Sequence, residues 1–389
     1  MLVSKRIAES RPLATTAMHG RVETLRANGE NVIDFSIAIS HFPAPPAVLR
    51  AVAAALLQPT LPYTGVGGAP ALRTRLADKA YRENQIDAHG AEVIVTNGAK
   101  QALYQALYVM TDPGDTVIVF RPYWPAYVAT SELLKLTVVL VDLPERLDAP
   151  LLASLPLAKV IILNNPHNPM GKVFDAEELG LLTAWLRKTS CRAIVDESYE
   201  KLAFSGRHIS LAATPDWRTL GIVSIFSSSQ SYAMMGWRAG FAVAPASVVA
   251  AMETLQGPIT ATASALTQAA ADAAFASGDQ PEMLADYRIR RDLVVNMFAN
   301  VSWIRMHTPD AGPYLWGDVA SLTADTIGFA ERLLEEQRVA IMPGDALGAP
   351  GFIRIGYISD DLETLQRGVA AIIDFGNRLA ALGRAPSSA

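Results

Sequence analysis

The chain has 389 residues, of which half are apolar and only 18% are charged. This composition excludes a mainly disordered protein, and the length predicts two or three domains. The formal net charge is −5, from 33 basic and 38 acidic residues, and no block of lysine and arginine occurs. We therefore expect no nucleic-acid partner and no membrane partner, and a small molecule is the expected ligand.

The cysteine and histidine content argues against a disulfide-linked protein and against a metal-binding protein. Cys191 is the single cysteine, so no intrachain disulfide can form, and the six histidines show no paired spacing of metal ligands. The N-terminal residues lack the apolar stretch of a signal peptide, and no apolar run is long enough to cross a membrane. We expect a soluble, cytoplasmic protein without a metal site.

Between residues 90 and 245, short β-branched runs alternate with helical patterns, which is typical of a parallel sheet covered by helices. The runs are EVIVT, DTVIVF, LTVVLVDL, AKVIILNN, CRAIVDES, GIVSIF and AGFAVAP. Residues 174–189 are predicted to form one of the helices, with Asp175 at the N-cap and Glu178 in the first turn. The region is predicted to be a large α/β domain.

The pattern changes after residue 245. Residues 247–276 are Ala-rich and predicted to be helical, and residues 281–300 form a long charged helix suited to joining two domains. The segments TPDAGPYLWGDV, RVAIMPGDAL and GFIRIGYI alternate like antiparallel strands, with helices at 325–337 and 360–382. We expect a large domain over 46–280 and a smaller α+β domain over 281–389, which residues 1–45 join.

Ligands of open parallel sheets bind at the carboxyl ends of the strands, so the residues after each run are candidate site residues. Gly98, Ala99 and Lys100 form a small-residue turn into a helix, whose N–H groups and dipole suit a phosphate. Trp124, in RPYWPAY, has a face that suits stacking on a planar ring, and the alternative is core packing. Each signal is weak alone, since such turns are more often only structural.

Further strand ends carry polar groups. Asn168 lies in a proline-rich turn that would direct its amide inward. Asp196 ends an apolar run that is predicted to be a buried strand. Burying a carboxylate costs free energy unless it has a positive partner, such as a protonated pyridine nitrogen. Ser227, Ser229 and Arg238 supply hydroxyls and a guanidinium, which suit a phosphate.

Together and in this order, the motifs resemble those of fold type I, pyridoxal-phosphate-dependent aminotransferases of class I and II, of the aspartate aminotransferase kind. The resemblance covers nearly the whole chain. It implies a mixed, mostly parallel seven-stranded sheet in the large domain and pyridoxal or pyridoxamine phosphate (PLP or PMP) as the cofactor. The segment 63–73, YTGVGGAPALR, is similar to one whose tyrosine, here Tyr63, reaches the phosphate bound by a neighbouring subunit, which implies a homodimer.

The resemblance also implies a role for each motif residue. The phosphate would be held by Gly98, Ala99, Lys100, Ser227, Ser229 and Arg238. The ring would contact Trp124 by stacking, Asp196 through its nitrogen, and Asn168 and Tyr199 through its phenolic oxygen. Arg354, in FIRIGY, would bind the α-carboxylate of an amino acid or 2-oxo acid near Asn168 and Ala38. The alternative for Arg354 is a solvated charge on a strand.

Gln230 stands where the family carries the lysine that bonds the cofactor and moves the catalytic proton. A carboxamide cannot condense with an aldehyde or act as a base, and general acid–base catalysis alone is worth about 10²–10⁴-fold. We therefore expect a cofactor held without a covalent link and a poor transaminase. Some other basic residues lie near the motifs, but their matched family positions do not reach the reacting carbon: Lys100, Lys172, Lys201 and His167.

Three interpretations remain open. The first is an aminotransferase for an L-amino acid and a 2-oxo acid whose lysine was replaced by engineering, which a coding sequence with lysine at 230 would settle. The second is a naturally lysine-less PLP or PMP enzyme of a specialised biosynthetic pathway with chemistry other than transamination. Departures from the family pattern at residues 38–42 and at Met170 favour it. The third is a non-catalytic PLP-binding protein, which turnover of an amino acid would exclude.

Overall fold

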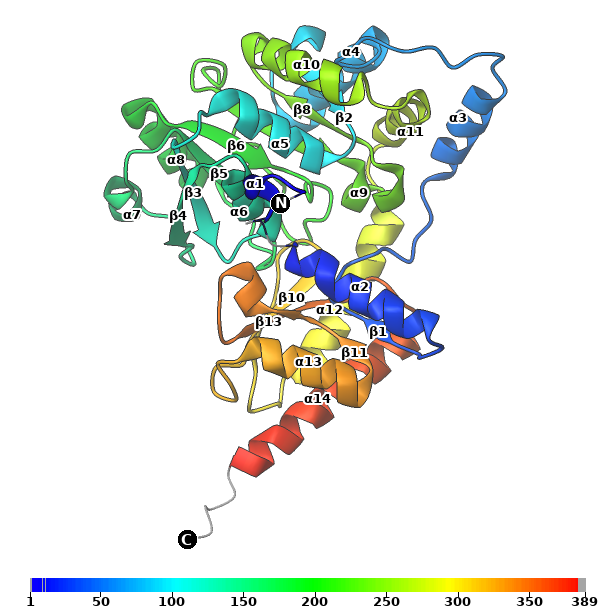
Figure 1. Cartoon of the computed structure of the whole chain (residues 1–389), viewed down its shortest axis with the longest axis vertical. Coiled ribbons are helices and arrows are strands. Elements are labelled where there is room, and N and C mark those ends of the chain that lie inside the picture. Colours follow the sequence, from blue (N-terminus) through cyan, green and yellow to red (C-terminus); the bar gives the residue numbers. More distant parts are fainter. Residues whose placement is uncertain (1, 9, 11, 384–389) are drawn as a thin grey trace.

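The computed structural model describes residues 2–8, 10 and 12–383. They form two parts, each built around its own sheet (Figure 1). The larger part, cyan and green in Figure 1, contains a seven-stranded sheet, and the smaller part, mainly orange and red, contains a four-stranded one. Among the described residues, no helix is both long enough and apolar enough to cross a bilayer.

The large sheet consists of the seven predicted runs. They are β2 (Val93–Thr96), β3 (Thr116–Arg121), β4 (Thr137–Asp142), β5 (Val160–Asn164), β6 (Arg192–Asp196), β7 (Ile222–Ser227) and β8 (Gly240–Val243). Their order is β2-β8-β7-β6-β5-β3-β4, and β8 is antiparallel to both of its neighbours. The other neighbouring strands are parallel, so the expected mixed, mostly parallel sheet is confirmed.

Alternate residues of the strands enter two separate cores. In β3, Val117 and Val119 face one core while Ile118 and Phe120 face the other, as strand geometry requires. The first core is covered by α5 (Ala99–Met110), α6 (Pro125–Leu133) and α10 (Ala246–Thr260). The second is covered by α3 (Pro46–Leu56), α4 (Pro70–Asn84), α7 (Ala149–Ser154), α8 (Ala176–Thr189) and α11 (Ala265–Ala276).

Local sequence signals explain where several helices begin and end. Asp175 caps α8 as predicted, because its side chain accepts the backbone N–H of Glu178 at 2.9 Å. The Ala-rich stretch forms α10 and α11 rather than one helix, and Ala261 adopts a left-handed φ of 58° between them. Short elements complete this part: α9 (Ser228–Ser231) and 3₁₀ helices at Gly90–Glu92 and Met235–Trp237.

The smaller part combines the C-terminal region with the N-terminal segment. Its sheet has the order β12 (Met342–Pro343), β13 (Phe352–Gly356), β10 (Tyr314–Asp318) and β9 (Arg305–His307), all antiparallel. Separately, β1 (Ile33–Asp34) pairs in parallel with β11 (Val339–Ala340). The helices are α2 (Ala14–Ala27), α12 (Pro281–Phe298), α13 (Thr326–Gln337) and α14 (Leu362–Gly383), with a 3₁₀ turn at Gly344–Leu347. The short helix α1 (Lys5–Ala8) precedes α2 in the chain. The boundaries at residues 45 and 280 stay a prediction.

The segment that contains α3 lies at the edge of the large part (Figure 1). Helix α3 packs on α11, and the chain after α3 runs along the outside of the large part (Figure 1). This segment exposes several large apolar side chains, namely Leu49, Leu56, Leu57, Leu61 and Tyr63. A surface of this kind is typical of a contact with another protein.

Candidate active site

A cavity of about 320 Å³ lies where the carboxyl ends of the large-sheet strands meet the smaller part. Most of the residues that the sequence singled out line it. They are Ala99, Lys100, Trp124, Asn168, Asp196, Tyr199, Ser227, Ser229, Gln230, Arg238 and Arg354. They come from turns far apart in the sequence, and the parallel strands bring these turns to one edge of the sheet.

Three predicted residues do not line this cavity. Gly98 has a φ of 79°, and a Cβ on it would lie 2.4 Å from an Nη2 atom of Arg238, so glycine allows the arginine to approach the turn. Ala38 is buried in the core of the smaller part, and its neighbour Ile37 lines the cavity instead. Tyr63 is 88% exposed and lies outside the cavity of its own chain.

Asp196 is a buried carboxyl group held by three donors. It accepts hydrogen bonds from the Tyr127 hydroxyl at 2.8 Å and from the hydroxyl and N–H of Ser198 at 2.5 and 3.1 Å. Burial nevertheless raises the pKa of Asp196, although these hydrogen bonds act to lower it. A cationic N–H group beside Asp196 would remove that penalty, so the site suits a protonated ring nitrogen.

The neighbouring polar pair is Asn168 and Tyr199. The amide of Asn168 donates to the Tyr199 hydroxyl oxygen at 3.2 Å, and the Asn168 N–H donates to the side chain of Asn164 at 2.6 Å. Burial raises the pKa of Tyr199 well above its ordinary value. Tyr199 therefore keeps its proton and can donate it to an oxygen in the cavity.

Arg354 is a buried cation, only 2% exposed, and no carboxylate pairs with it among the residues described. Its guanidinium donates to Oδ1 of Asn168 at 3.1 Å and to the carbonyl of Ser36 at 2.7 Å, and it lies 3.9 Å from the Tyr314 ring centroid. Its Nε has no hydrogen-bond partner within the described part of the chain. A buried guanidinium with free donor capacity is a site for an anion such as a carboxylate.

Another part of the cavity lining carries basic side chains and backbone N–H groups. The first turn of α5 presents N–H groups without partners inside the helix, and Arg238 and Lys100 lie beside it. Ser227 caps α9 by accepting the N–H of Ser229 at 3.1 Å, which leaves its own hydroxyl proton free to donate. This group of donors suits a phosphate.

Gln230 lies on α9, and its buried Oε1 has no hydrogen-bond partner among the residues that the structure describes. Of the four basic residues considered as substitutes, the structure brings Lys100 alone into the cavity. Lys172 pairs with Glu178 at 2.8 Å, and Lys201 pairs with Glu83 at 2.7 Å. His167 is buried, and burial lowers its pKa to about 3.

Sequence reasoning missed the residues that α2 and β10 supply. Thr15, Thr16 and His19 line the cavity from α2, and Tyr314 lines it from β10. The His19 ring lies with Nδ1 3.2 Å from a carboxylate oxygen of Asp34. No local motif marks these residues, because their position depends on where α2 packs.

The cavity therefore fits PLP. A phosphate would lie at α5, Ser227, Ser229 and Arg238, the ring would lie against Trp124, and Asp196 would face the ring nitrogen. The unpaired Oε1 of Gln230 and Nε of Arg354 are buried polar atoms that a bound molecule would satisfy.

The family model for class I and II aminotransferases matches residues 30–372. The chain belongs to this family. It is 32% identical to an aspartate aminotransferase of Geobacillus stearothermophilus, over 96% of this chain and 99% of the relative. It is 29% identical to an aspartate/prephenate aminotransferase of Nitrosomonas europaea, over 96% of this chain and 100% of that protein.

Solved structures of aminotransferases have the same fold as this chain. The aspartate aminotransferase of Thermus thermophilus with maleate superposes with a TM-score of 0.90 at 30% identity, covering 96% of this chain and 100% of that one. The fold type I aminotransferase fold expected from the motifs is therefore confirmed, and the chain belongs to a family of PLP-dependent enzymes. The roles of the individual site residues, including the substrate contact of Ala38, stay predictions.

Proposed function

We propose that this chain binds PLP and acts on an L-amino acid and a 2-oxo acid without the family lysine at position 230. The observation that carries the proposal is the buried guanidinium of Arg354, which has no carboxylate partner among the described residues. It lies in the same cavity as Asp196, so the cavity has one place for a carboxylate and one for a cationic ring nitrogen. Arg354 would hold the α-carboxylate, and the substrate identity beyond that is open.

Bound PLP supplies a protonated ring that accepts electrons from the Cα of an amino acid. Asp196 would keep a proton on the ring nitrogen, and the Tyr199 hydroxyl, which lies beside Asn168, would donate to the phenolic oxygen. Ser227, Ser229 and Arg238, with the turn at 98–100, would hold the phosphate. Trp124 lines the cavity and would supply the stacking surface for the ring.

A second candidate function is PLP or PMP chemistry other than transamination. Gln230 favours it, because a carboxamide cannot carry the proton that transamination moves between two carbons. The other polar residues of the cavity, such as Asp196, Arg238 and Arg354, are present. This candidate therefore uses the same cofactor and the same carboxylate site as the first. A non-catalytic PLP-binding protein is the outcome if no amino acid is turned over.

We also propose a homodimer in the cytoplasm. The exposed apolar segment that contains Leu57, Leu61 and Tyr63 would pack on a second copy, where Tyr63 would reach the partner's phosphate site. The single cysteine, Cys191, is buried and unpaired, which is compatible with a reducing compartment.

The test is reconstitution of the full chain with PLP, removal of free cofactor by gel filtration, and an amino-donor screen. We expect about one PLP per chain to be retained, and Gln230→Lys to raise transamination about 10²–10⁴-fold. Gln230→Met is the matched control, since it fills the same space without an amine. A protein that retains no PLP, in either the natural chain or Gln230→Lys, would contradict the proposed function.

A further inference from the structure

The cavity contains an amine although position 230 does not. The chain has eight lysines, and of those within the described residues Lys100 alone lines the cavity. Its Nζ lies 5.2 Å from the centroid of the Trp124 ring. It is therefore above the flat surface on which a planar cofactor would stack, in the same cavity as Gln230.

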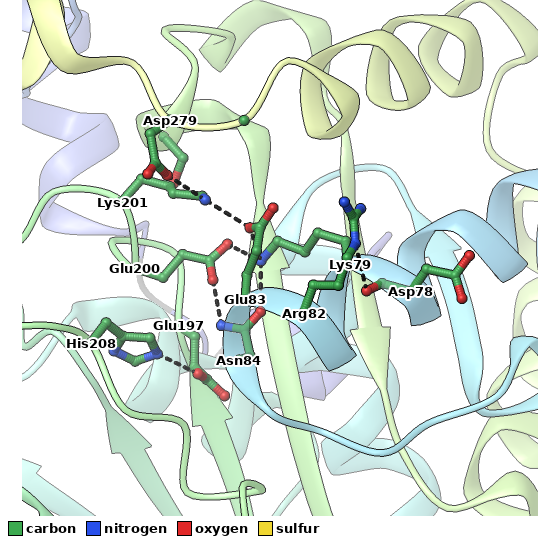
Figure 2. Close-up of polar contacts among 12 residues, drawn as sticks. Asp78, Lys79, Arg82, Glu83, Asn84, Glu197, Glu200, Lys201, His208 and Asp279 are labelled. Atoms are coloured by element: carbon green, nitrogen blue, oxygen red, sulfur yellow. Dashed lines mark hydrogen bonds and ion pairs between the residues drawn. The ribbon is translucent and has the colours of Figure 1, made fainter.

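Other lysines near the site are held by carboxylates. Lys79 is buried and pairs with Glu200, and Lys201 pairs with Glu83 and Asp279 at 2.7 Å each (Figure 2). Lys172 pairs with Glu178 at 2.8 Å. Each of these ammonium groups is held by a carboxylate and lies outside the cavity lining, so none of them is placed to react with a molecule bound there.

Lys100 differs from them in its surroundings. No ion pair or hydrogen bond holds its Nζ in the part of the chain that the structure describes. The residue is second in α5, where the positive end of the helix dipole disfavours a cation. The side chain is open to the cavity, yet partial burial lowers its pKa, and the charge of Arg238 lowers it further. These effects increase the share of neutral, nucleophilic amine.

The covalent structure of PLP indicates that the amine of Lys100 could approach its aldehyde. Its aldehyde is on the ring carbon next to the carbon that carries the phosphate arm. In the proposed function, the phosphate lies at the turn 98–100, where the backbone of Lys100 begins. The family position matched by Lys100 is not one that reaches the reacting carbon. In this chain, however, Nζ lies over the Trp124 ring, and the flexible four-carbon stem of the lysine could bring it to the aldehyde along that surface.

We propose that Lys100 forms the covalent link to PLP in this chain, in place of residue 230. The lone pair of neutral Nζ attacks the aldehyde carbon, and the carbonyl oxygen leaves as water with the two protons of the amine. A C=N bond replaces the C=O bond, so the step consumes no oxidant or reductant. The inference rests on the proposed function, because it requires PLP in the cavity, and it replaces the sequence-based expectation of a purely non-covalent cofactor.

The test is borohydride reduction of the PLP-loaded full chain, followed by proteolysis and mass spectrometry. We expect a pyridoxyl group on the peptide that contains Lys100, and a visible absorption band of the C=N bond before reduction. Lys100→Arg keeps the positive charge but cannot form the link, so it should retain PLP and lose both the label and the band. Lys188→Arg, at an exposed position on α8, is the matched control and should be labelled like the natural chain.

The outcomes separate the two proposals. PLP that is retained but leaves Lys100 unlabelled, or a label on a different lysine, would overturn the Lys100 link and leave PLP binding intact. A chain that retains no PLP would overturn both. A pyridoxyl label on Lys100 in the natural chain and in Lys188→Arg, together with no label in Lys100→Arg, supports the link.

Discussion

The side chains of Arg354 and Asn168 meet between the two sheets, where Nη1 of Arg354 donates to Oδ1 of Asn168 at 3.1 Å. Asn168 follows β5 of the large sheet, and Arg354 lies in β13 of the small one. The amide of Asn168 also donates to Tyr199 at 3.2 Å. A carboxylate bound by Arg354 is thereby coupled, through one amide, to the hydroxyl proposed to contact the cofactor.

The first prediction concerns this guanidinium. Arg354→Lys keeps the charge but removes the forked donor group, and hydrogen bonds to charged groups are worth about 1.5–3 kcal/mol. We expect the affinity for a 2-oxo acid to fall about 10–100-fold while PLP retention is unchanged, as measured by titration calorimetry on the PLP-loaded protein. Arg305→Lys, whose side chain is 85% exposed, is the control. An unchanged dissociation constant for Arg354→Lys would exclude a role in carboxylate binding.

The second prediction concerns the stability of the cofactor-free protein. Burial raises the pKa of Asp196, so the folded chain binds more protons at this group than the unfolded chain does. Its contribution to the free energy of unfolding therefore declines as pH rises above the ordinary carboxyl pKa. Asp196→Asn should remove this decline. Thermal unfolding of the two proteins without PLP, between about pH 4 and 8, measures it.

With PLP present, we expect Asp196→Asn to reduce the stabilisation that the cofactor gives the folded protein. Asp196→Asn removes the negative partner of the ring nitrogen, so PLP should raise the melting temperature of the variant less than that of the natural chain. Equal shifts in the two proteins would show that Asp196 does not face a cationic group.

A third prediction concerns the buried pair of Lys79 and Glu200, whose side chains are 1% and 4% exposed (Figure 2). Burial acts to raise the pKa of Glu200, but the charges of Lys79 and Lys201 and a hydrogen bond from Asn84 hold it below its ordinary value. Breaking a buried pair costs about 3–5 kcal/mol. We expect Glu200→Gln to cost about 3 kcal/mol at neutral pH, at the lower end because Glu83 also lies 3.5 Å from Lys79.

The pH dependence of that cost has a definite sign. A carboxyl group with a depressed folded pKa stabilises the protein above its unfolded pKa, and the stabilisation is lost as pH falls below it. The natural chain and Glu200→Gln should therefore converge in urea denaturation toward acid pH. A difference that stays constant with pH would argue against a charged pair, and Lys79→Met combined with Glu200→Gln should recover part of the loss.

A fourth prediction concerns the exposed segment after α3. Leu57→Glu should shift the sedimentation equilibrium of the protein from dimer to monomer, because the side chain is 85% exposed within an apolar segment. Leu157→Glu changes a side chain that is 84% exposed elsewhere, and it should leave the dimer intact. A natural chain that sediments as a monomer and still retains PLP would refute the proposed dimer.

Tyr63→Phe separates assembly from cofactor binding. It removes one hydroxyl and keeps the apolar ring, so the dimer should persist while the dissociation constant of PLP rises about 10–100-fold. Equilibrium dialysis of the dimer measures that constant. No change would place Tyr63 away from the partner's phosphate site.

Much of this site is predictable because its residues follow strands directly. Asp196 and Ser227 end β6 and β7, and Asn168 and Lys100 lie within a few residues of strand ends, so locating the strands locates these groups. The fixed order of parallel strands then places them along one edge. The same local rule gives Asp175 as the cap of α8.

Other contacts depend on packing between distant segments. Tyr127 donates to Asp196 from α6, and Tyr314 lies against Arg354. The segment RPYWPAY marks Trp124 as a candidate but does not reveal that Tyr127 contacts Asp196, and no motif marks Tyr314. His19 reaches the cavity because of where α2 packs, which no spacing within α2 reveals. Ile37 lies in a bend at residues 36–37 and lines the cavity, whereas its neighbour Ala38 enters the core, an offset of one residue that the sequence motif does not resolve.

The pairing of β1 with β11 has a consequence for biosynthesis. Ile33 leaves the ribosome about 300 residues before its partner Val339. At about 5–20 residues per second, that interval lasts roughly 15–60 s. During translation the segment with β1 and α2 has no native partner in the smaller part, so the seven-stranded sheet can fold around its own helices first. The cavity then acquires the lining from α2 only after the last fifth of the chain has been synthesised.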